Sequence, residues 1–319
     1  MINLITGGTG FIGSHLAREL HKRGEKVVLF DIKENCEIIK DIRDDISIVK
    51  GDLGSWPEVL HAVEEKKIDT IFHTGSLLSA SAEANPIAGY STNANGTFTL
   101  LEAARLFKVK KFIYTSTIAS YGIDLPAVVD EYTIQRPRTM YGVTKVFSEL
   151  LGEYYNLRFG IIFRALRLPS VIGPGRGEGG LSAYSTLMIS EPALGRPYTI
   201  PVKEDTVMAI QYIKDAVEAL IMLRDAKGKH LKRNTYNIAG FLPKAMDIVN
   251  SVRKYLPDAV IKCIPDEKTV EIVDSWARTI DETKAKEEWG WEPKYFLDET
   301  VEDFIRELQN RRDMYAPRV

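Results

Sequence analysis

Cysteine and long apolar runs are what this 319-residue sequence has least of. Its two cysteines, Cys36 and Cys263, lie far apart and form neither a metal-ligand nor a redox spacing. We therefore expect reduced thiols, no metal site and a cytoplasmic location. No apolar run approaches the length of a transmembrane helix, and no signal-peptide pattern opens the chain. We expect no membrane partner.

An excess of charge of one sign is also missing. The 42 basic and 44 acidic residues leave a net charge of −2. This balance gives no reason to expect nucleic acid as a partner. The length suits one large domain or two closely packed lobes.

The chain does have a glycine-rich turn near its start. Residues 2–5 form a short apolar run of strand type, and helical periodicity resumes from residue 14. Between them, Gly7 permits the turn, Gly10 lets the backbone approach a pyrophosphate, and Gly13 allows close helix packing. A strand, a glycine turn and a helix in this order predict a dinucleotide site at the helix N-terminus.

A carboxylate follows the second strand pattern. A strand is expected at 26–30, apolar from Val27 to Phe30, and it ends at Asp31. At this position a carboxylate accepts hydrogen bonds from both ribose hydroxyls and repels a 2′-phosphate. The sequence therefore favours NAD over NADP.

Strand and helix patterns alternate through the first half of the chain. Further strands are expected at 46–50, 70–73, 111–114 and 160–167, with helices at 56–66, at 88–107 and around Tyr141. This alternation predicts an α/β fold, a doubly wound parallel sheet of Rossmann type. Ligands of such sheets bind beyond the carboxyl ends of the strands.

Tyr141 is followed four residues later by Lys145. On a helix the two side chains share one face. A free phenol has a pKa of about 10 and is a poor base at neutral pH. We expect the ammonium of Lys145 to stabilise the phenolate and lower that pKa, so that Tyr141 exchanges a proton with a substrate hydroxyl or carbonyl.

Together these motifs resemble the extended short-chain dehydrogenase/reductases over nearly the whole chain. The matching segments are TGGTGFIG at 6–13, GDL at 51–53, FHTGS at 72–76, NANGT at 93–97, TSTIASYG at 115–122 and EWGWEP at 288–293. The resemblance implies that Thr117 orients the substrate oxygen, Tyr141 transfers the proton, and Lys145 binds the nicotinamide ribose. It implies NAD contacts from Gly7, Gly10, Phe11, Ile12, Gly13, Asp31, Asp52, Leu53, Thr74, Gly75, Ser76, Asn93, Thr115, Tyr141, Lys145 and Leu168.

Within this family, residues 135–145, QRPRTMYGVTK, are similar to a segment of the short-chain L-threonine 3-dehydrogenases. That resemblance implies substrate contacts from Ser79, Thr117, Tyr141, Ser182 and Trp276. The departure from the subgroup lies at 173–184. Leu181 and Ser182 replace a threonine pair and Ala183 replaces an aspartate, so L-threonine itself is in question. Arg176 and Glu178 are either replacement ligands or solvated loop charges.

A nucleotide-sugar 4-epimerase or dehydratase with tightly bound NAD is the alternative, because VIGPG at 171–175 resembles that subgroup. Two features oppose it: the asparagine expected near residue 168 is missing, and Thr206-Val207-Met208 stands where an arginine would clamp a diphosphate. A third reading, a non-catalytic NAD-sensing scaffold, conflicts with the intact Thr117, Tyr141 and Lys145 set.

The sequence thus predicts an NAD-dependent dehydrogenase that acts on the secondary alcohol of a small polar metabolite. We expect a Rossmann domain at 1–167 plus 207–240, and a smaller, largely C-terminal substrate lobe at 168–206 plus 241–319. The family resemblance also implies a homodimer that pairs through the helices holding Asn93 and Tyr141.

Overall fold

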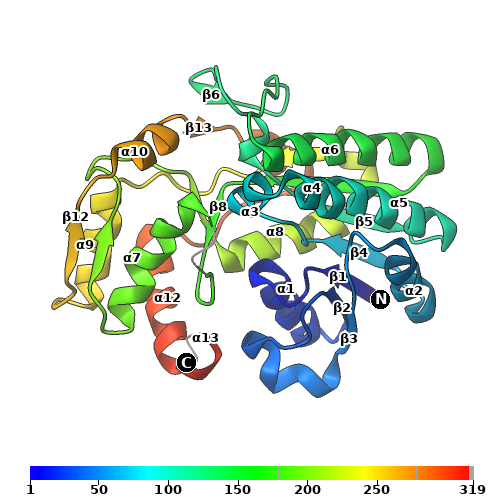
Figure 1. Ribbon diagram of the computed structural model, residues 1–319, viewed down its shortest axis with the longest axis horizontal. Coiled ribbons are helices and arrows are strands. Elements are labelled where there is room, and N and C mark those ends of the chain that lie inside the picture. The colour runs from blue at the N-terminus through cyan, green and yellow to red at the C-terminus, as the bar shows by residue number, and fades with distance from the viewer. Residues whose placement is uncertain (178–179, 278, 316–319) are drawn as a thin grey trace.

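Seven parallel strands form the central sheet of the computed structural model, which describes residues 1–177, 180–277 and 279–315. Their order across the sheet is β11-β7-β5-β4-β1-β2-β3 (Figure 1). The strands are β1 (Ile2–Thr6), β2 (Lys26–Asp31), β3 (Ser47–Lys50), β4 (Thr70–His73), β5 (Lys111–Thr117), β7 (Ile162–Leu168) and β11 (Thr235–Asn237). The predicted Rossmann-type α/β fold is confirmed.

The chain reverses its direction of travel across the sheet between β1 and β4. From β1 it runs outward to β2 and β3, then returns to β4 on the other side of β1. His73, at the end of β4, ties these strands together, with Nδ1 2.7 Å from Thr6 Oγ1 and Nε2 3.0 Å from Thr97 Oγ1. Burial lowers the pKa of His73 to about 3, so the imidazole is neutral. This reversal is the place where such sheets bind their ligands.

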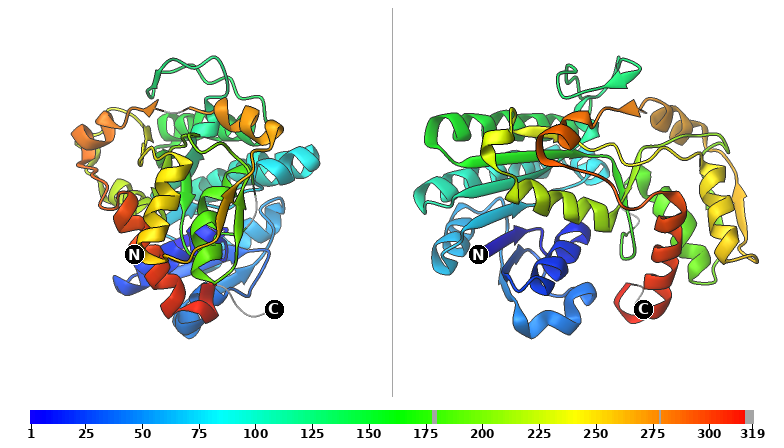
Figure 2. Two further views of the ribbon diagram at one scale, coloured as in Figure 1. Left: turned by 90° about the vertical axis from the view of Figure 1, so that its left-hand side faces the viewer. Right: turned by 180° about the vertical axis from the view of Figure 1, so that it is seen from behind.

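Helices cover both faces of the sheet because its strands are apolar on both sides. Leu4 packs into one core and Ile5, its neighbour, into the other. One face carries α1 (Phe11–Lys22) and α8 (Ile213–Asp225), and the other carries α2 (Trp56–Lys66), α5 (Gly96–Leu106) and α6 (Met140–Phe159) (Figure 2).

A second group of elements lies beside the carboxyl ends of the strands (Figure 1). Its strand pairs are β8 (Ser170–Ile172) with β10 (Ile210–Tyr212), and β9 (Tyr198–Ile200) with β12 (Ile261–Cys263). Its helices are α7 (Tyr184–Ala193), α9 (Ala245–Tyr255), α10 (Glu267–Asp274) and α12 (Leu297–Asn310). The remaining elements are β6 (Val128–Val129) paired with β13 (Thr279–Ile280), and helices α3 (Ser79–Ala84), α4 (Pro86–Gly89), α11 (Thr283–Trp289) and α13 (Arg312–Tyr315).

We propose the lobe boundaries given by the sequence, at 167/168, 206/207 and 240/241. The returning segment carries α8, which packs on the sheet, and β11, which extends it beside β7. The paired strands β6 and β13 join the two parts, because one lies before residue 167 and the other after residue 241.

The expected helix at 88–107 is present, but its hydrogen bonding changes along its length. The structure has the short α4, a π-helical turn at Tyr90–Asn95, and then α5. A 3.6-residue periodicity does not reveal a local change to wider hydrogen bonding. Within the described ranges, no helix is long and apolar enough to cross a membrane, and no group of His, Cys, Asp and Glu side chains could hold a metal ion.

Candidate active site

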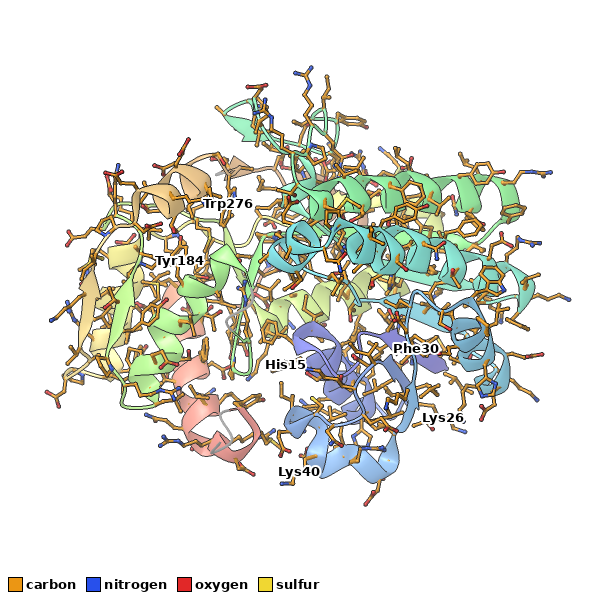
Figure 3. All side chains as sticks on the ribbon, viewed as in Figure 1. His15, Lys26, Phe30, Lys40, Tyr184 and Trp276 are labelled. Carbon is orange, nitrogen blue, oxygen red and sulfur yellow. The ribbon has the colours of Figure 1, made fainter. Side chains whose placement is uncertain are left out.

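A cavity of about 910 Å³ runs along the carboxyl ends of the strands. Phe30, on β2, and Trp276, just after α10, mark its two ends (Figure 3). All the predicted site residues line it except Asn93. Sequence segments that lie far apart along the chain therefore meet at one site.

The glycine turn is packed too tightly for side chains. Gly7 has a φ of +64°, and a Cβ there would lie 2.5 Å from Gly75 Cα. A Cβ on Gly13 would lie 2.2 Å from the carbonyl oxygen of Gly7. Gly10 is the N-cap of α1 and provides no side-chain cap, so the first N–H groups of the helix remain available beside the cavity. This cradle fits a dinucleotide pyrophosphate.

Asp31 is oriented by its own strand end. Its Oδ2 accepts a hydrogen bond from the Thr9 backbone N–H at 3.0 Å, and its Oδ1 accepts one from the Lys33 backbone N–H at 3.2 Å. Each oxygen keeps a further lone pair for a ribose hydroxyl. The donor and acceptor set at this end of the cavity therefore fits NAD.

Lys145 is buried beside Tyr141 on α6. Its Nζ donates a hydrogen bond to the Thr115 carbonyl at 2.7 Å and lies 5.3 Å from the centroid of the Tyr141 ring. The side chain is only 2% exposed, and burial lowers the pKa of Lys145 to about 7, although Glu149 acts in the opposite direction. Because burial outweighs the effect of Glu149, this amine changes its charge near neutral pH.

The hydroxyl of Tyr141 interacts with the hydroxyls of Thr117 and Ser76. Burial raises the pKa of Tyr141 to about 12, and these two hydroxyls and the charge of Arg176 oppose that rise. The expectation that Lys145 lowers this pKa is wrong for the protein alone, because burial dominates and an amine with a pKa of about 7 is neutral at the pH where the phenol ionises. Tyr141 is held protonated and positioned by its hydroxyl neighbours.

A buried ion pair links α6, the helix that carries Tyr141 and Lys145, to β7. Glu149, one turn after Lys145 on α6, pairs with Arg167 on β7 at 2.7 Å. Glu149 also accepts hydrogen bonds from Ser116 and Gln135. The sequence interpretation missed this pair, although a glutamate four residues after Lys145 on the same helix face was a visible signal.

Asn93 lies behind the cavity wall. Its Oδ1 accepts a hydrogen bond from the Leu77 N–H at 2.8 Å, and its Nδ2 donates to the Leu77 carbonyl at 3.0 Å. The amide is 2% exposed and also contacts Thr144. Because both amide groups hold neighbouring backbone, the structure gives Asn93 a positioning role and places it outside the lining residues.

The residues predicted to contact the substrate all line the cavity: Ser79, Thr117, Tyr141, Ser182 and Trp276. We call this part of the cavity its proposed substrate end. Arg176 lines the same end and is hydrogen bonded, so the structure excludes a freely solvated loop charge for it. Glu178, the other candidate replacement, lies outside the described residues.

Comparison with known proteins agrees with a dinucleotide-binding fold. The model of the NAD dependent epimerase/dehydratase family matches residues 3–239. The mitochondrial L-threonine 3-dehydrogenase of Bos taurus is 33% identical over 302 residues, which are 93% of this chain and 80% of that protein. The L-threonine dehydrogenase of Phytophthora infestans superposes with a TM-score of 0.89 at 34% identity, covering 98% and 100% of the two chains.

A UDP-glucose 4-epimerase from Thermotoga maritima superposes with a TM-score of 0.84 at 25% identity, covering 97% of this chain and 99% of that one. The two kinds of relative thus share one architecture. With the glycine turn, the cavity and the family match in agreement, the chain belongs to the NAD-dependent epimerase/dehydratase family and is an NAD-dependent enzyme of the extended short-chain dehydrogenase/reductase type.

Proposed function

We propose that the protein oxidises the secondary alcohol of a small polar metabolite, as an L-threonine 3-dehydrogenase does. The observation that carries this proposal is the meeting of Thr117, Tyr141 and Lys145 at one wall of the cavity, with Thr117 close enough to the Tyr141 hydroxyl to lower its pKa. Bound NAD supplies the hydride acceptor. The residues of the chain supply position and the proton transfer.

The proposed roles follow from the contacts of each side chain. Thr117 and Ser76 lie beside the phenol where a substrate hydroxyl binds. Tyr141 gives its own phenolic proton to the neutral amine of Lys145 and takes the proton from the substrate hydroxyl as the carbonyl forms. Lys145, fixed by the Thr115 carbonyl, brings a titratable amine beside the tyrosine and the ribose. Trp276 and Leu168 exclude water from the reacting carbon.

The alternative, a nucleotide-sugar 4-epimerase or dehydratase, rests on the shared architecture. It requires a cation for a diphosphate, and the segment 206–208 places Val207 and Met208 on the cavity wall in place of an arginine. An anionic diphosphate at that wall would lose its charged partner. This composition favours the dehydrogenase, and the epimerase would have to use Arg176 as the cation instead.

The decisive experiment is NADH formation by the purified protein with NAD and L-threonine, with L-serine and a substrate-free reaction as controls. Rapid threonine-dependent reduction supports the L-threonine dehydrogenase assignment. NAD that stays bound through purification, together with interconversion of UDP-sugars, would favour the epimerase instead.

We also propose a homodimer that pairs through α5 and α6. The outer face of α6 carries Val143, Phe147, Leu150, Tyr154 and Leu157, which are 42–84% exposed and recur at alternating intervals of four and three residues. Such a stripe is an apolar helix face without a partner in the monomer. A cytoplasmic location stays a prediction from the two unpaired cysteines.

A further inference from the structure

Arg176 is held at the substrate end of the cavity by neutral partners. Its Nη1 donates hydrogen bonds to Ser170 Oγ at 2.9 Å and to the Val171 carbonyl at 2.6 Å. Its Nη2 donates one to Ser182 Oγ at 2.6 Å. These contacts fix the plane of the guanidinium without neutralising its charge.

Two arginines that are more deeply buried have acidic partners, unlike Arg176 among the described contacts. Arg167 is paired with Glu149, and Arg224 is paired with Glu25 and with its neighbouring aspartate. Across the described ranges, no acidic side chain lies within ion-pair distance of Arg176. Burial lowers the pKa of Arg176 to about 10.

The turn that carries Arg176 is fixed by packing. Gly175, the preceding residue, has a φ of +85°, and a Cβ there would lie 2.6 Å from Ile38 Cδ1. Arg176 is also close enough to Tyr141 that its charge lowers the pKa of the phenol. A partly buried and oriented cation therefore lies beside the group that exchanges the proton.

From these observations we propose that Arg176 binds the carboxylate of the substrate, which makes the substrate a hydroxy acid. This inference rests on the proposed oxidation of a secondary alcohol. The Nε–H and the second Nη2–H of Arg176 have no acceptor among the described residues and can grip a carboxylate. Because Arg176 is near Tyr141, the carboxylate belongs close to the carbon that is oxidised.

The cavity gives an ammonium group no matching partner. Among its described lining residues the carboxylates are Asp31 and Asp52, both placed at the proposed NAD end. Ala183, where the threonine dehydrogenases carry an aspartate, is a buried methyl group. The carboxylate of a hydroxy acid is therefore the group that this pocket selects, and an amine adds nothing to recognition.

The first test compares three substrates that share a carbon skeleton: 3-hydroxybutanoate, its neutral analogue 3-hydroxybutanamide, and L-threonine. With wild-type protein and NAD we expect kcat/KM for 3-hydroxybutanoate to equal or exceed that for L-threonine. We expect the amide to be lower by about 10- to 150-fold, the range of a hydrogen bond to a charged group. An amide used as well as the acid, or a clear preference for L-threonine, overturns the proposal.

The second test changes Arg176 itself. Arg176→Gln should raise KM for 3-hydroxybutanoate by about 10- to 150-fold with a smaller change in kcat, while NADH binding is unchanged. Arg176→Lys should recover part of the loss, because it keeps the charge without the fork. Arg43→Gln, at an exposed arginine outside the cavity, should leave KM unchanged. An unchanged KM in Arg176→Gln refutes the assignment.

A binding experiment separates this inference from the proposed reaction. Acetoacetate, titrated calorimetrically into protein saturated with NAD, cannot turn over. Binding that Arg176→Gln abolishes supports the anion site even if no alcohol is oxidised. No binding to the wild type overturns it even if another alcohol is oxidised. UDP-glucose provides the diphosphate comparison, and Arg176-dependent binding of it without acetoacetate binding would also refute the carboxylate assignment.

Discussion

Tyr141 is the residue that we propose takes the proton of the substrate hydroxyl at the cavity wall. Its hydroxyl interacts with Thr117 and Ser76, whose own pKa values are too high for proton exchange. Tyr141→Phe should therefore reduce kcat by at least about 100-fold, the usual contribution of a general acid–base group, and leave NAD affinity within about twofold. Steady-state kinetics and NAD titration measure both. Tyr132→Phe, at a tyrosine 77% exposed, is the control, and equal kcat in both variants would remove Tyr141 from the mechanism.

Lys145 is predicted to reduce stability while it serves the site. Its folded-state pKa of about 7 lies below the ordinary value, so the buried ammonium destabilises the fold fully below pH 7. This destabilisation decreases as the pH rises from about 7 to about 10.5, the pKa of lysine in the unfolded chain. Over that range the free energy of unfolding rises by up to about 1.4 kcal/mol per pH unit. Lys145→Met should therefore unfold at higher denaturant than wild type at pH 6, with the gap closing by pH 10.

The matched control for this variant is Lys229→Met, at an exposed lysine. Chemical denaturation curves of the three proteins at pH 6, 8 and 10 give the free energies of unfolding. Lys145→Met should also lose turnover. A pH-independent difference from wild type would show that the buried amine does not carry this linkage.

At the scale of the element, the turn between β1 and α1 depends on glycine at the third position of the helix. Gly13→Ala adds a methyl group 2.2 Å from the Gly7 carbonyl oxygen. The clash should outweigh the gain in helix propensity of roughly 1 kcal/mol and weaken NAD binding by at least about tenfold, because the turn must open. Isothermal titration with NAD measures the effect.

Gly228→Ala is the control for this substitution, since a Cβ there has only Arg164 Nη2 near, at 3.9 Å. It should leave the NAD affinity of the protein unchanged. Wild-type NAD affinity in Gly13→Ala would mean that the turn does not hold the pyrophosphate.

The elements were predictable where their signals are local. The apolar runs of β1, β2 and β4 and the glycine turn each depend on a few consecutive residues, so the fold and its ligand-binding edge follow from the sequence. The pairing of Glu149 with Arg167 and the role of Asn93 in holding Leu77 join separate segments. The contacts of Arg176 lie within one loop, but they depend on how that loop folds. Such contacts, and the pKa values that burial sets for Tyr141 and Lys145, require the tertiary structure.

At the scale of the whole molecule, the exposed apolar stripe on α6 argues for a second copy of the chain. A two-fold symmetric contact buries each stripe residue twice, so one substitution acts in both protomers. Leu150 is 60% exposed, and Leu150→Glu should remove about 1.5–3 kcal/mol of apolar burial per protomer and place a charge in the contact. We expect the dimer Kd to rise by at least about 100-fold, measured by sedimentation equilibrium. Val260→Glu, beside β12 at the opposite end of the molecule (Figure 1), changes an equally exposed apolar residue and should leave the dimer intact. A wild-type protein that sediments as a monomer at micromolar concentration would refute the dimer and leave the α6 stripe without this role.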